Sequence, residues 1–354
     1  MNIVHICNVG ESPNGIKTVL KKLSFEQIKL GNRVRVFSLR KGEPEFDHIK
    51  SVSNFYKKIH HDKPDVVIFH SLYHFMYIPF YAILSLCKIP YMIELHGTLS
   101  YENYKVNHLK KYIANIMCFN HFVKKASCII YLNQNEYENS FAKTINPQYL
   151  IIPNGCDTMD LSDKKTPNMP IKFIFIGRLD PFHKGLDILF KAIELVALSE
   201  LRNKVKFLFY GSVYDSHIEW IDSYFSKIGS IAEFKGPVYA KQKDEAIRDA
   251  DIFILTSRYE GMPMGVLEAL SYGLPCILTS ETNMGEEVAS VNAGWLTELT
   301  PVAIASTIHE AVSKYLLEYQ CLKQNSLSLS KKYNWSKIAE ESVDKYLTML
   351  GRIN

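Results

Sequence analysis

The sequence predicts an α/β protein built from two doubly wound domains, each a parallel β-sheet with helices on both faces. The chain has 354 residues, which is more than a single hydrophobic core usually supports. Short apolar runs alternate with longer segments of helical composition, a pattern typical of parallel strands that are buried on both faces. A polar segment with two prolines, residues 157–170, separates these runs into two series and is the best candidate for a linker.

We expect six strands in each series, because each contains six short apolar runs. The runs of the first series are residues 2–9, 33–39, 65–70, 90–95, 127–132 and 149–153. The runs of the second series are residues 171–177, 205–211, 232–236, 250–257, 275–280 and 294–298. We place a first domain at residues 1–165 and a second at residues 166–335, and we expect residues 336–354 to form a helix that crosses back to the first domain.

The composition is that of a globular protein. A net charge of +4 does not indicate a nucleic-acid-binding protein. The seven cysteines include no CxxC pair, which favours reduced thiols in a cytoplasmic protein. The first residues lack the basic segment and cleavage site of a signal peptide. Residues 71–87 carry no charge, but their length and Pro79 favour a buried or interfacial helix over a membrane span.

Open α/β sheets bind ligands beyond the carboxyl ends of their strands, so the residues that follow each expected strand are candidates for a site. After the first strand, Gly10 and Gly15 flank a loop that enters a helix at about Ile16. Such a loop can present N–H groups to an anion or a sugar, and an ordinary strand–helix turn explains it equally well. His96 ends another strand, where it can donate to a hydroxyl or a phosphate, or simply cap the strand.

The second series contains the charged candidates. Arg178 follows a strand, and Lys184 precedes Gly185 and a helix. Cations are unfavourable at the N-terminal end of a helix dipole, so this arrangement indicates a site for a diphosphate. Glu260 lies in a loop after another strand, where it can bind hydroxyl groups. Glu268 is expected in or near the first turn of the next helix, where an acid also complements the dipole.

Three motifs in these loops resemble one family. They are IPNG at residues 152–155, GRLDPFHKG at residues 177–185, and the E-x7-E element EGMPMGVLE at residues 260–268. The sequence resembles the retaining glycosyltransferases of the GT-B fold in family 4, along the whole chain and most strongly in its second half. The resemblance implies two Rossmann-like domains that face each other across a cleft, the first binding an acceptor and the second a nucleotide sugar.

The resemblance also implies a role for each candidate. Arg178 and Lys184 would hold the diphosphate. Glu260 would contact hydroxyls of the transferred sugar, and Glu268 would bind the ribose hydroxyls. His96 would lie against the sugar ring and the leaving phosphate. The catalytic set is then His96, Glu260, Arg178 and Lys184, and the other donor-binding positions are Gly15, Met264, Gly265, Val266 and Glu268.

The expected chemistry is sugar transfer with retention and without a metal ion. Bond cleavage builds negative charge on the diphosphate, and preorganised cations and N–H dipoles stabilise that charge as the bond lengthens. The family mechanism implies front-face attack, with the leaving phosphate as the base. We expect no cofactor and no metal, since the DxD match at residues 249–251 resembles a helix–strand junction.

The acceptor is less defined by the sequence. Residues 103–135 contain no acid, and residues 104–125 are basic and aromatic, as on a helix that binds an anionic membrane surface. A solvated helix with a buried aromatic face explains this stretch equally well. The membrane interpretation implies a glycan or lipid-linked acceptor in surface polysaccharide assembly, such as lipopolysaccharide or capsule, at the inner face of the plasma membrane. Asn14-Gly15 replaces the two adjacent glycines of many relatives, which leaves the acceptor geometry open.

Three functions remain open. Sugar transfer from a nucleotide sugar is favoured, with UDP expected as the nucleotide and GDP second. A GT-B sugar-nucleotide epimerase would instead turn over the donor without an acceptor. A nucleotide-sugar-binding partner subunit without catalysis is the third, and the intact set Arg178, Lys184, Glu260 and Glu268 argues against it.

Overall fold

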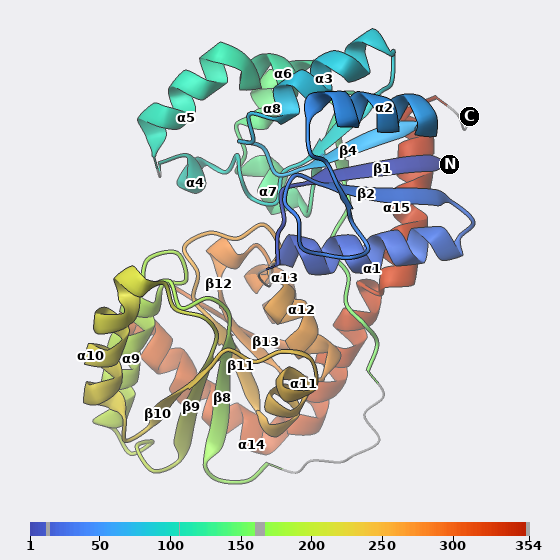
Figure 1. Ribbon diagram of the computed structural model, residues 1–354. Coiled ribbons are helices and arrows are strands. Elements are labelled where there is room, and N and C mark those ends of the chain that lie inside the picture. Colours follow the sequence, from blue (N-terminus) through green and yellow to red (C-terminus); the bar gives the residue numbers. More distant parts are fainter. Residues whose placement is uncertain (12–14, 106, 160–166, 352–354) are drawn as a thin grey trace. The chain divides into compact units, whose positions relative to one another are not determined.

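The computed structural model describes residues 1–11, 15–105, 107–159 and 167–351. The chain forms two compact units, each around one parallel sheet (Figure 1). Unit 1 comprises Met1–Gly155 and Asn334–Asn354, and unit 2 comprises Cys156–Tyr333. The predicted boundary near residue 165 lies outside the described residues, and the contacts divide the chain ten residues earlier, between Gly155 and Cys156.

The sheet of unit 1 has the order β3-β2-β1-β4-β5-β6-β7, and its paired strands are parallel. The strands are β1 (Asn2–Cys7), β2 (Arg33–Ser38), β3 (Asp47–His48), β4 (Val66–His70), β5 (Tyr91–Glu94), β6 (Cys128–Tyr131) and β7 (Tyr149–Ile151). All six strands expected in the first series are confirmed. Strand β3 was not expected, because two residues are too few to show an apolar pattern.

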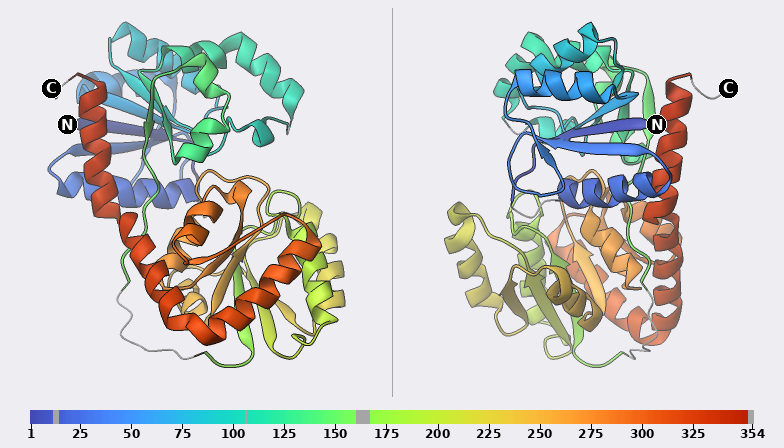
Figure 2. Two further views of the ribbon diagram at one scale, coloured as in Figure 1. Left: turned by 180° about the vertical axis from the view of Figure 1, so that it is seen from behind. Right: turned by 45° about the vertical axis from the view of Figure 1, so that its right-hand side comes forward.

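Helices cover both faces of this sheet. They are α1 (Gly15–Lys29), α2 (Val52–Asp62), α3 (Tyr77–Leu86), α4 (Tyr101–Lys105), α5 (His108–Ala114), the π-helix η1 (Asn115–Phe119), α6 (Asn120–Lys125), α7 (Gln134–Glu138), α8 (Ala142–Ile145) and α15 (Trp335–Met349). The main core of unit 1 joins one sheet face to side chains of α2, α3 and α6. On the other face lies α1, with the C-terminal helix α15 packed along it (Figure 2).

The uncharged segment at residues 71–87 forms no more than one short helix. This is α3, of 10 residues, which buries Tyr77, Phe80 and Leu84. The prediction of a buried or interfacial helix in this segment is therefore confirmed. Among the residues that the structure describes, no helix has the length and apolar character needed to cross a bilayer.

The sheet of unit 2 has the order β10-β9-β8-β11-β12-β13, and its paired strands are also parallel. The strands are β8 (Ile171–Ile176), β9 (Val205–Tyr210), β10 (Ala232–Gly236), β11 (Ile252–Leu255), β12 (Cys276–Thr279) and β13 (Gly294–Thr297). The helices are α9 (Leu186–Ala197), η2 (Asp215–His217), α10 (Ile218–Ile228), α11 (Ala240–Asp249), α12 (Met264–Ser271), η3 (Ser280–Thr282), α13 (Gly285–Ser290) and α14 (Pro301–Lys332). All six strands of the second series are confirmed.

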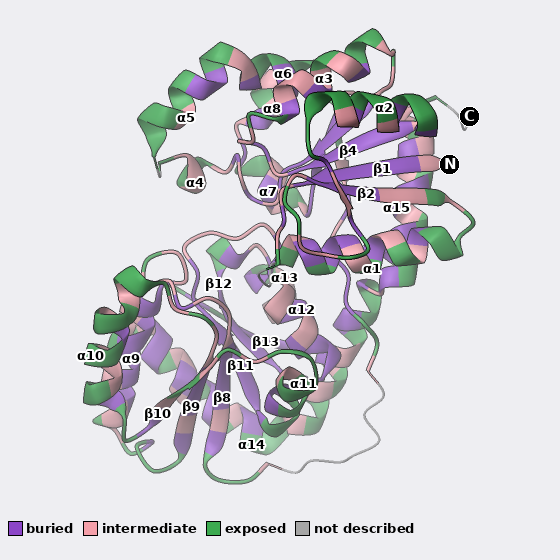
Figure 3. Ribbon diagram, in the orientation of Figure 1, coloured by how far each residue is buried: buried purple, intermediate pink, exposed green. Residues whose placement is uncertain are grey.

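The strand order reverses once in each sheet, between β1 and β4 in unit 1 and between β8 and β11 in unit 2. Chains that leave two such neighbouring strands run to opposite faces, and a crevice opens at their carboxyl ends. The central strands are buried along almost their whole length (Figure 3). Rigid, buried strands therefore position the residues that follow β1, β4, β8 and β11.

Candidate functional site

The candidate donor site of unit 2 lies in the two loops at the reversal point of its sheet. One loop runs from the end of β8 to α9 and contains Arg178, His183 and Lys184. The other runs from the end of β11 to α12 and contains Ser257 and Glu260. The sequence separates these loops by more than 70 residues, and the fold brings them into direct contact.

An ion pair between Lys184 and Glu260 joins the two loops. The Lys184 ammonium donates to Glu260 Oε1, and the side chains are 14% and 12% exposed. Ser257 Oγ donates to the same oxygen at 2.6 Å. All these contacts reach Oε1 of the carboxylate, and Lys184 has three donors on its ammonium group. Lys184 can therefore bind a further anion while it holds Glu260.

The environment keeps Glu260 ionised. Burial by itself would raise the pKa of the Glu260 carboxyl, but the charge of Lys184 and the hydrogen bonds from Lys184 and Ser257 outweigh it and lower that pKa. Burial also lowers the pKa of His183, whose Nδ1 lies 3.3 Å from Arg178 Nη2. A neutral His183 accepts from Arg178 at Nδ1 and donates from Nε2 to the Tyr259 carbonyl at 2.9 Å.

Further contacts fix the backbone around Glu260. Its N–H donates to the Glu281 carbonyl at 3.0 Å, and Asn283 Nδ2 donates to the Glu260 carbonyl at 2.7 Å. Arg258 forms a bidentate pair with Asp187 of α9, with both distances 2.7 Å. These contacts make the loop a rigid support, which positions the Glu260 carboxylate before any ligand binds.

Arg178 has spare hydrogen-bonding capacity. Its side chain is 38% exposed and lies over the Tyr214 ring, 4.9 Å from the ring centroid. Its Nε atom is buried and makes no hydrogen bond within the described part of the chain. A guanidinium that keeps unsatisfied donors beside a second cation is suited to a diphosphate.

Helix α12 begins beside this cluster. Its N-cap, Pro263, provides no side-chain hydrogen bond, so the first N–H groups of the helix are not capped. The N–H of Val266 already donates to the Pro263 carbonyl at 3.1 Å. The N–H of Val266, a predicted donor-binding residue, is therefore engaged within the loop, and Met264 and Gly265 supply the first N–H groups of the helix. A Cβ on Gly265 would lie 3.3 Å from the Ile176 carbonyl oxygen, so the helix start packs against the end of β8.

Glu268 is the fifth residue of α12, directly after the first turn, as the sequence predicted. Its carboxylate pairs with Lys243 of α11 and belongs to a different cluster from that of Glu260. The two glutamates of the E-x7-E element thus have separate basic partners. The residues at 249–251 do form the expected junction, between α11 and β11, where Asp249 pairs with Lys172 at 2.7 Å.

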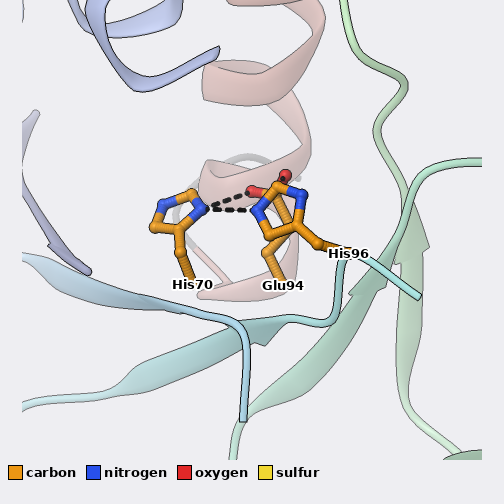
Figure 4. A group of neighbouring side chains, drawn as sticks. All are labelled: His70, Glu94 and His96. Carbon is orange, nitrogen blue, oxygen red and sulfur yellow. Dashed lines mark hydrogen bonds and ion pairs between the residues drawn. The ribbon is translucent and has the colours of Figure 1, made fainter. Parts of the chain in front are cut away.

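His96 of unit 1 belongs to a buried cluster at the carboxyl ends of β4 and β5 (Figure 4). Its Nε2 lies 3.0 Å from His70 Nδ1 and 3.3 Å from Glu94 Oε1. Its backbone φ is 50°, a left-handed conformation that a non-glycine residue rarely adopts and that is common at functional sites. His70, Glu94 and the deeper His5 were not predicted. Each is a titratable residue within an apolar strand run, and that pattern could have identified them.

Burial controls the charge of this cluster. It raises the pKa of Glu94 to about 8, with a smaller contribution from Glu136. It lowers the pKa of His96 to about 4 and places the pKa of His70 well below its ordinary value. The histidines are therefore neutral at pH 7, and each can donate from only one ring nitrogen.

The remaining prediction in unit 1 concerns the first loop. Gly15 begins α1 and is exposed. An anion could therefore reach the start of this helix. Asn14 lies outside the described residues. Gly15 and His96 belong to unit 1, and the other predicted site residues belong to unit 2.

Two sheets of this topology, each with its reversal point, define the GT-B class of glycosyltransferase folds. The structure is similar to Anabaena HepE in complex with UDP, with a TM-score of 0.77 and 15% identity over 98% of this chain and 100% of that chain. It is also similar to sucrose-phosphate synthase from Thermosynechococcus elongatus, with a TM-score of 0.78 and 16% identity over 99% of this chain and 100% of that chain.

The sequence assigns the family. The family model for glycosyl transferases group 1 matches residues 170–314, and that for glycosyltransferase family 4 matches residues 13–160. The chain therefore belongs to the glycosyltransferases that these two models describe, namely glycosyl transferases group 1 and glycosyltransferase family 4. An uncharacterized glycosyltransferase of Methanocaldococcus jannaschii, MJ1607, is 21% identical over 96% of this chain and 96% of its own length. The putative colanic acid biosynthesis glycosyltransferase WcaL of Salmonella typhimurium is 26% identical over 37% of this chain and 33% of its length.

Proposed function

We propose that this protein transfers a sugar, with retention, from a nucleotide sugar to a glycan or lipid-linked glycan in surface polysaccharide assembly. The observation that carries the proposal is the cluster of Lys184, Glu260 and Arg178 beside the uncapped start of α12. UDP is the favoured nucleotide, since the similar HepE structure is described as a complex with UDP. The similarity to WcaL, named for colanic acid biosynthesis, supports the polysaccharide acceptor.

The proposed roles follow from the charges. Arg178 and Lys184 neutralise the diphosphate, and the N–H groups of Met264 and Gly265 add a helix dipole of the same sign. Negative charge on the leaving oxygen grows in the transition state, so these fixed groups stabilise it more than the ground state. Glu260 binds hydroxyls of the transferred sugar through Oε2, and Glu268 binds the ribose. In this proposal the cations of the chain supply the charge neutralisation, and the transfer needs no cofactor and no metal ion. The leaving phosphate accepts the acceptor proton.

UDP is expected to stabilise the protein against heat more than GDP, ADP or NAD. At a concentration of about 100 times its dissociation constant, a ligand adds about 2.7 kcal/mol to the free energy of unfolding. Thermal shift with the four nucleotides measures this directly, and Glu268→Ala is expected to reduce the UDP shift because the ribose loses its acceptor.

Lys243→Met is the matched control, since it breaks the same ion pair without removing the carboxylate. It should keep the UDP shift. Loss of the shift in both variants would assign the effect of Glu268→Ala to the ion pair and would contradict ribose binding. Release of UDP from a UDP-sugar that requires an acceptor then separates transfer from epimerisation.

The helical run at residues 108–125 supports a membrane-bound acceptor. Phe119 and Phe122 are buried in the core, as the alternative of a helix with a buried aromatic face predicted, and Phe122 packs on Phe69 of β4 and Tyr91 of β5. The opposite side has an exposed apolar stripe that the sequence analysis did not predict. Its members are Leu109 (69% exposed), Tyr112 (50%), Ile113 (49%), Ile116 (63%) and Met117 (74%).

These five residues, which we call the α5 stripe, follow the spacing i, i+3, i+4, i+7 and i+8 along α5 and the π-helix η1 that continues it, and all five are exposed. Lysines 105, 110, 124 and 125 are exposed around it. An apolar stripe with a basic border and no acid between residues 103 and 135 has the composition of a helix that lies in an anionic membrane interface. We therefore propose that unit 1 binds the membrane surface that holds the lipid-linked acceptor.

Vesicles of anionic phospholipid are expected to co-sediment with the protein at low salt, and neutral vesicles much less. The double variant Ile116→Ser/Met117→Ser should weaken binding at least tenfold, because burial of each side chain contributes about 1.5–3 kcal/mol. Leu317→Ser, at an 83% exposed leucine of α14, is the control and should bind like the wild type. Failure of the wild-type protein to bind anionic vesicles at low salt would contradict membrane docking. It would not contradict the proposed donor site.

A further inference from the structure

The side chains of His70, Glu94 and His96 converge as the ligands of one metal ion would. One potential ligand atom from each lies within 4.8 Å of the others. His70 Nδ1 lies 3.0 Å from His96 Nε2 and 3.4 Å from Glu94 Oε2, and His96 Nε2 lies 3.3 Å from Glu94 Oε1. Nitrogen and oxygen ligands about 2.0–2.1 Å from a tetrahedral zinc ion lie about 3.3 Å from one another. The separation of the two nitrogens is close to that spacing, and so is the distance from each nitrogen to its nearest Glu94 oxygen, which is Oε2 for His70 and Oε1 for His96.

A chain of hydrogen bonds from α15 determines which His70 nitrogen carries the proton. Ser342 Oγ donates to the Ala339 carbonyl at 2.7 Å, so it accepts from Gln27 Nε2 at 2.9 Å. The Gln27 amide oxygen therefore faces His5 Nε2, at 3.0 Å, and accepts its proton.

The same chain continues to His70. Neutral His5 has its lone pair on Nδ1, which lies 2.9 Å from His70 Nε2 and accepts from it. His70 then has a lone pair on Nδ1, directed at Glu94 and His96. A metal-binding histidine commonly donates its other N–H to a fixed acceptor in this way, which sets the ring orientation and the tautomer.

Glu94 provides the second, independent observation. Glu94 is 2% exposed, and its Oε2 atom makes no hydrogen bond within the described residues. A direct hydrogen bond from His96 to His70 would satisfy the two rings and leave this carboxyl oxygen unsatisfied. A buried polar atom without a partner is costly, and a cation between the three side chains would replace the carboxyl proton of Glu94 and provide that partner.

We propose that His70 Nδ1, Glu94 and His96 Nε2 bind one divalent transition-metal ion of the zinc type in unit 1. Two imidazoles with one carboxylate favour zinc over magnesium or calcium, which prefer oxygen ligands. Three protein ligands leave a fourth position for water. All three ligands belong to unit 1. The family resemblance implies that His96 contacts the sugar, and a metal ion bound at His96 Nε2 would exclude that contact.

The test is metal binding to the full chain without a histidine tag, after treatment with a chelator. One equivalent of Co²⁺ should bind and give visible d–d bands without a thiolate charge-transfer band, since the proposed ligands include no cysteine. Zn²⁺ should displace the Co²⁺ and raise the melting temperature, and Mg²⁺ should do neither. Donor and acceptor are absent from this experiment, so its outcome does not depend on the proposed function.

Variants identify the ligands. Glu94→Gln and His70→Asn should each weaken Zn²⁺ binding at least tenfold, and Gln27→Leu about 10–100-fold through loss of the His5 and His70 orientation. His121→Asn, at an exposed histidine of α6, should leave the affinity unchanged. Glu94→Gln keeps the shape of the side chain, and circular dichroism checks that each variant is folded. Absence of one-equivalent binding in the wild type, or unchanged affinity in folded Glu94→Gln, would overturn the proposal.

Discussion

Gly185→Ala is expected to lower the free energy of unfolding of unit 2 by about 4 kcal/mol or more, a size that point substitutions rarely reach. Gly185 is the N-cap of α9 and has a φ of 63°. A Cβ at this position would lie 2.0 Å from the carbonyl oxygen of Thr256 and 3.1 Å from its carbonyl carbon. These atoms belong to the backbone at the end of β11, so a side-chain rotation cannot relieve the overlap.

The same substitution should also damage the donor site. Lys184 directly precedes Gly185, and its carbonyl accepts from Thr256 Oγ1 at 3.3 Å. A backbone shift that accommodates the new methyl group moves the Lys184 ammonium away from Glu260. Urea unfolding monitored by tryptophan fluorescence measures the loss of stability, since Trp220 and Trp295 both lie in unit 2.

Gly236→Ala separates the overlap from the backbone strain. Gly236 has a φ of 76°, but a Cβ there would meet nothing within 4 Å. Its substitution should cost about 1 kcal/mol, the usual penalty for a left-handed alanine. Equal effects at the two glycines would show that the loops at the donor site adjust freely, contrary to the rigid support described above.

Lys184→Met is expected to lower the free energy of unfolding by about 2–3 kcal/mol and to abolish the UDP thermal shift. It leaves the Glu260 carboxylate largely buried without its counterion, and breaking a buried pair costs about 3–5 kcal/mol when exposure is negligible. The 14% and 12% exposure of the two side chains reduces that figure. Lys172→Met, which breaks an exposed pair with Asp249, is the control and should cost about 0–1 kcal/mol.

A double-mutant cycle and a pH series test the mechanism of this effect. Glu260→Gln in the Lys184→Met background should restore part of the stability, because no unpaired charge remains. In the wild type, the lowered pKa of Glu260 means that its stabilisation is present above the ordinary value of 4.5 and is lost as the pH falls through the lower folded-state pKa. The stability difference between Lys184→Met and wild type should shrink over the same interval, and a constant difference down to acid pH would exclude the ion pair as its cause.

The fold was largely predictable from local sequence. All twelve expected strands form, because buried parallel strands need continuous apolar runs and such runs are visible without any partner. The last helix was expected within residues 336–354 and is observed at Trp335–Met349. The candidate donor residues after β8 and β11 were also predicted, since the carboxyl ends of strands are where open α/β sheets bind ligands. The motifs at residues 177–185 and 260–268 further indicated the glycosyltransferase family.

Tertiary structure decided which of these residues touch. The sequence assigned Glu260 and Glu268 to two different sugars of one ligand but did not indicate their partners in the fold, which are Lys184 for Glu260 and Lys243 for Glu268. The cluster of His70, Glu94 and His96 joins the ends of two strands with a buried relay from α1 and α15. The α5 stripe became visible only when its neighbours Phe119 and Phe122 were seen to fill the core. A short continuous apolar run between turns predicts a buried strand from local sequence alone. Pairing between charges and exposure of an apolar face depend on elements distant in the chain, and only folding brings those together.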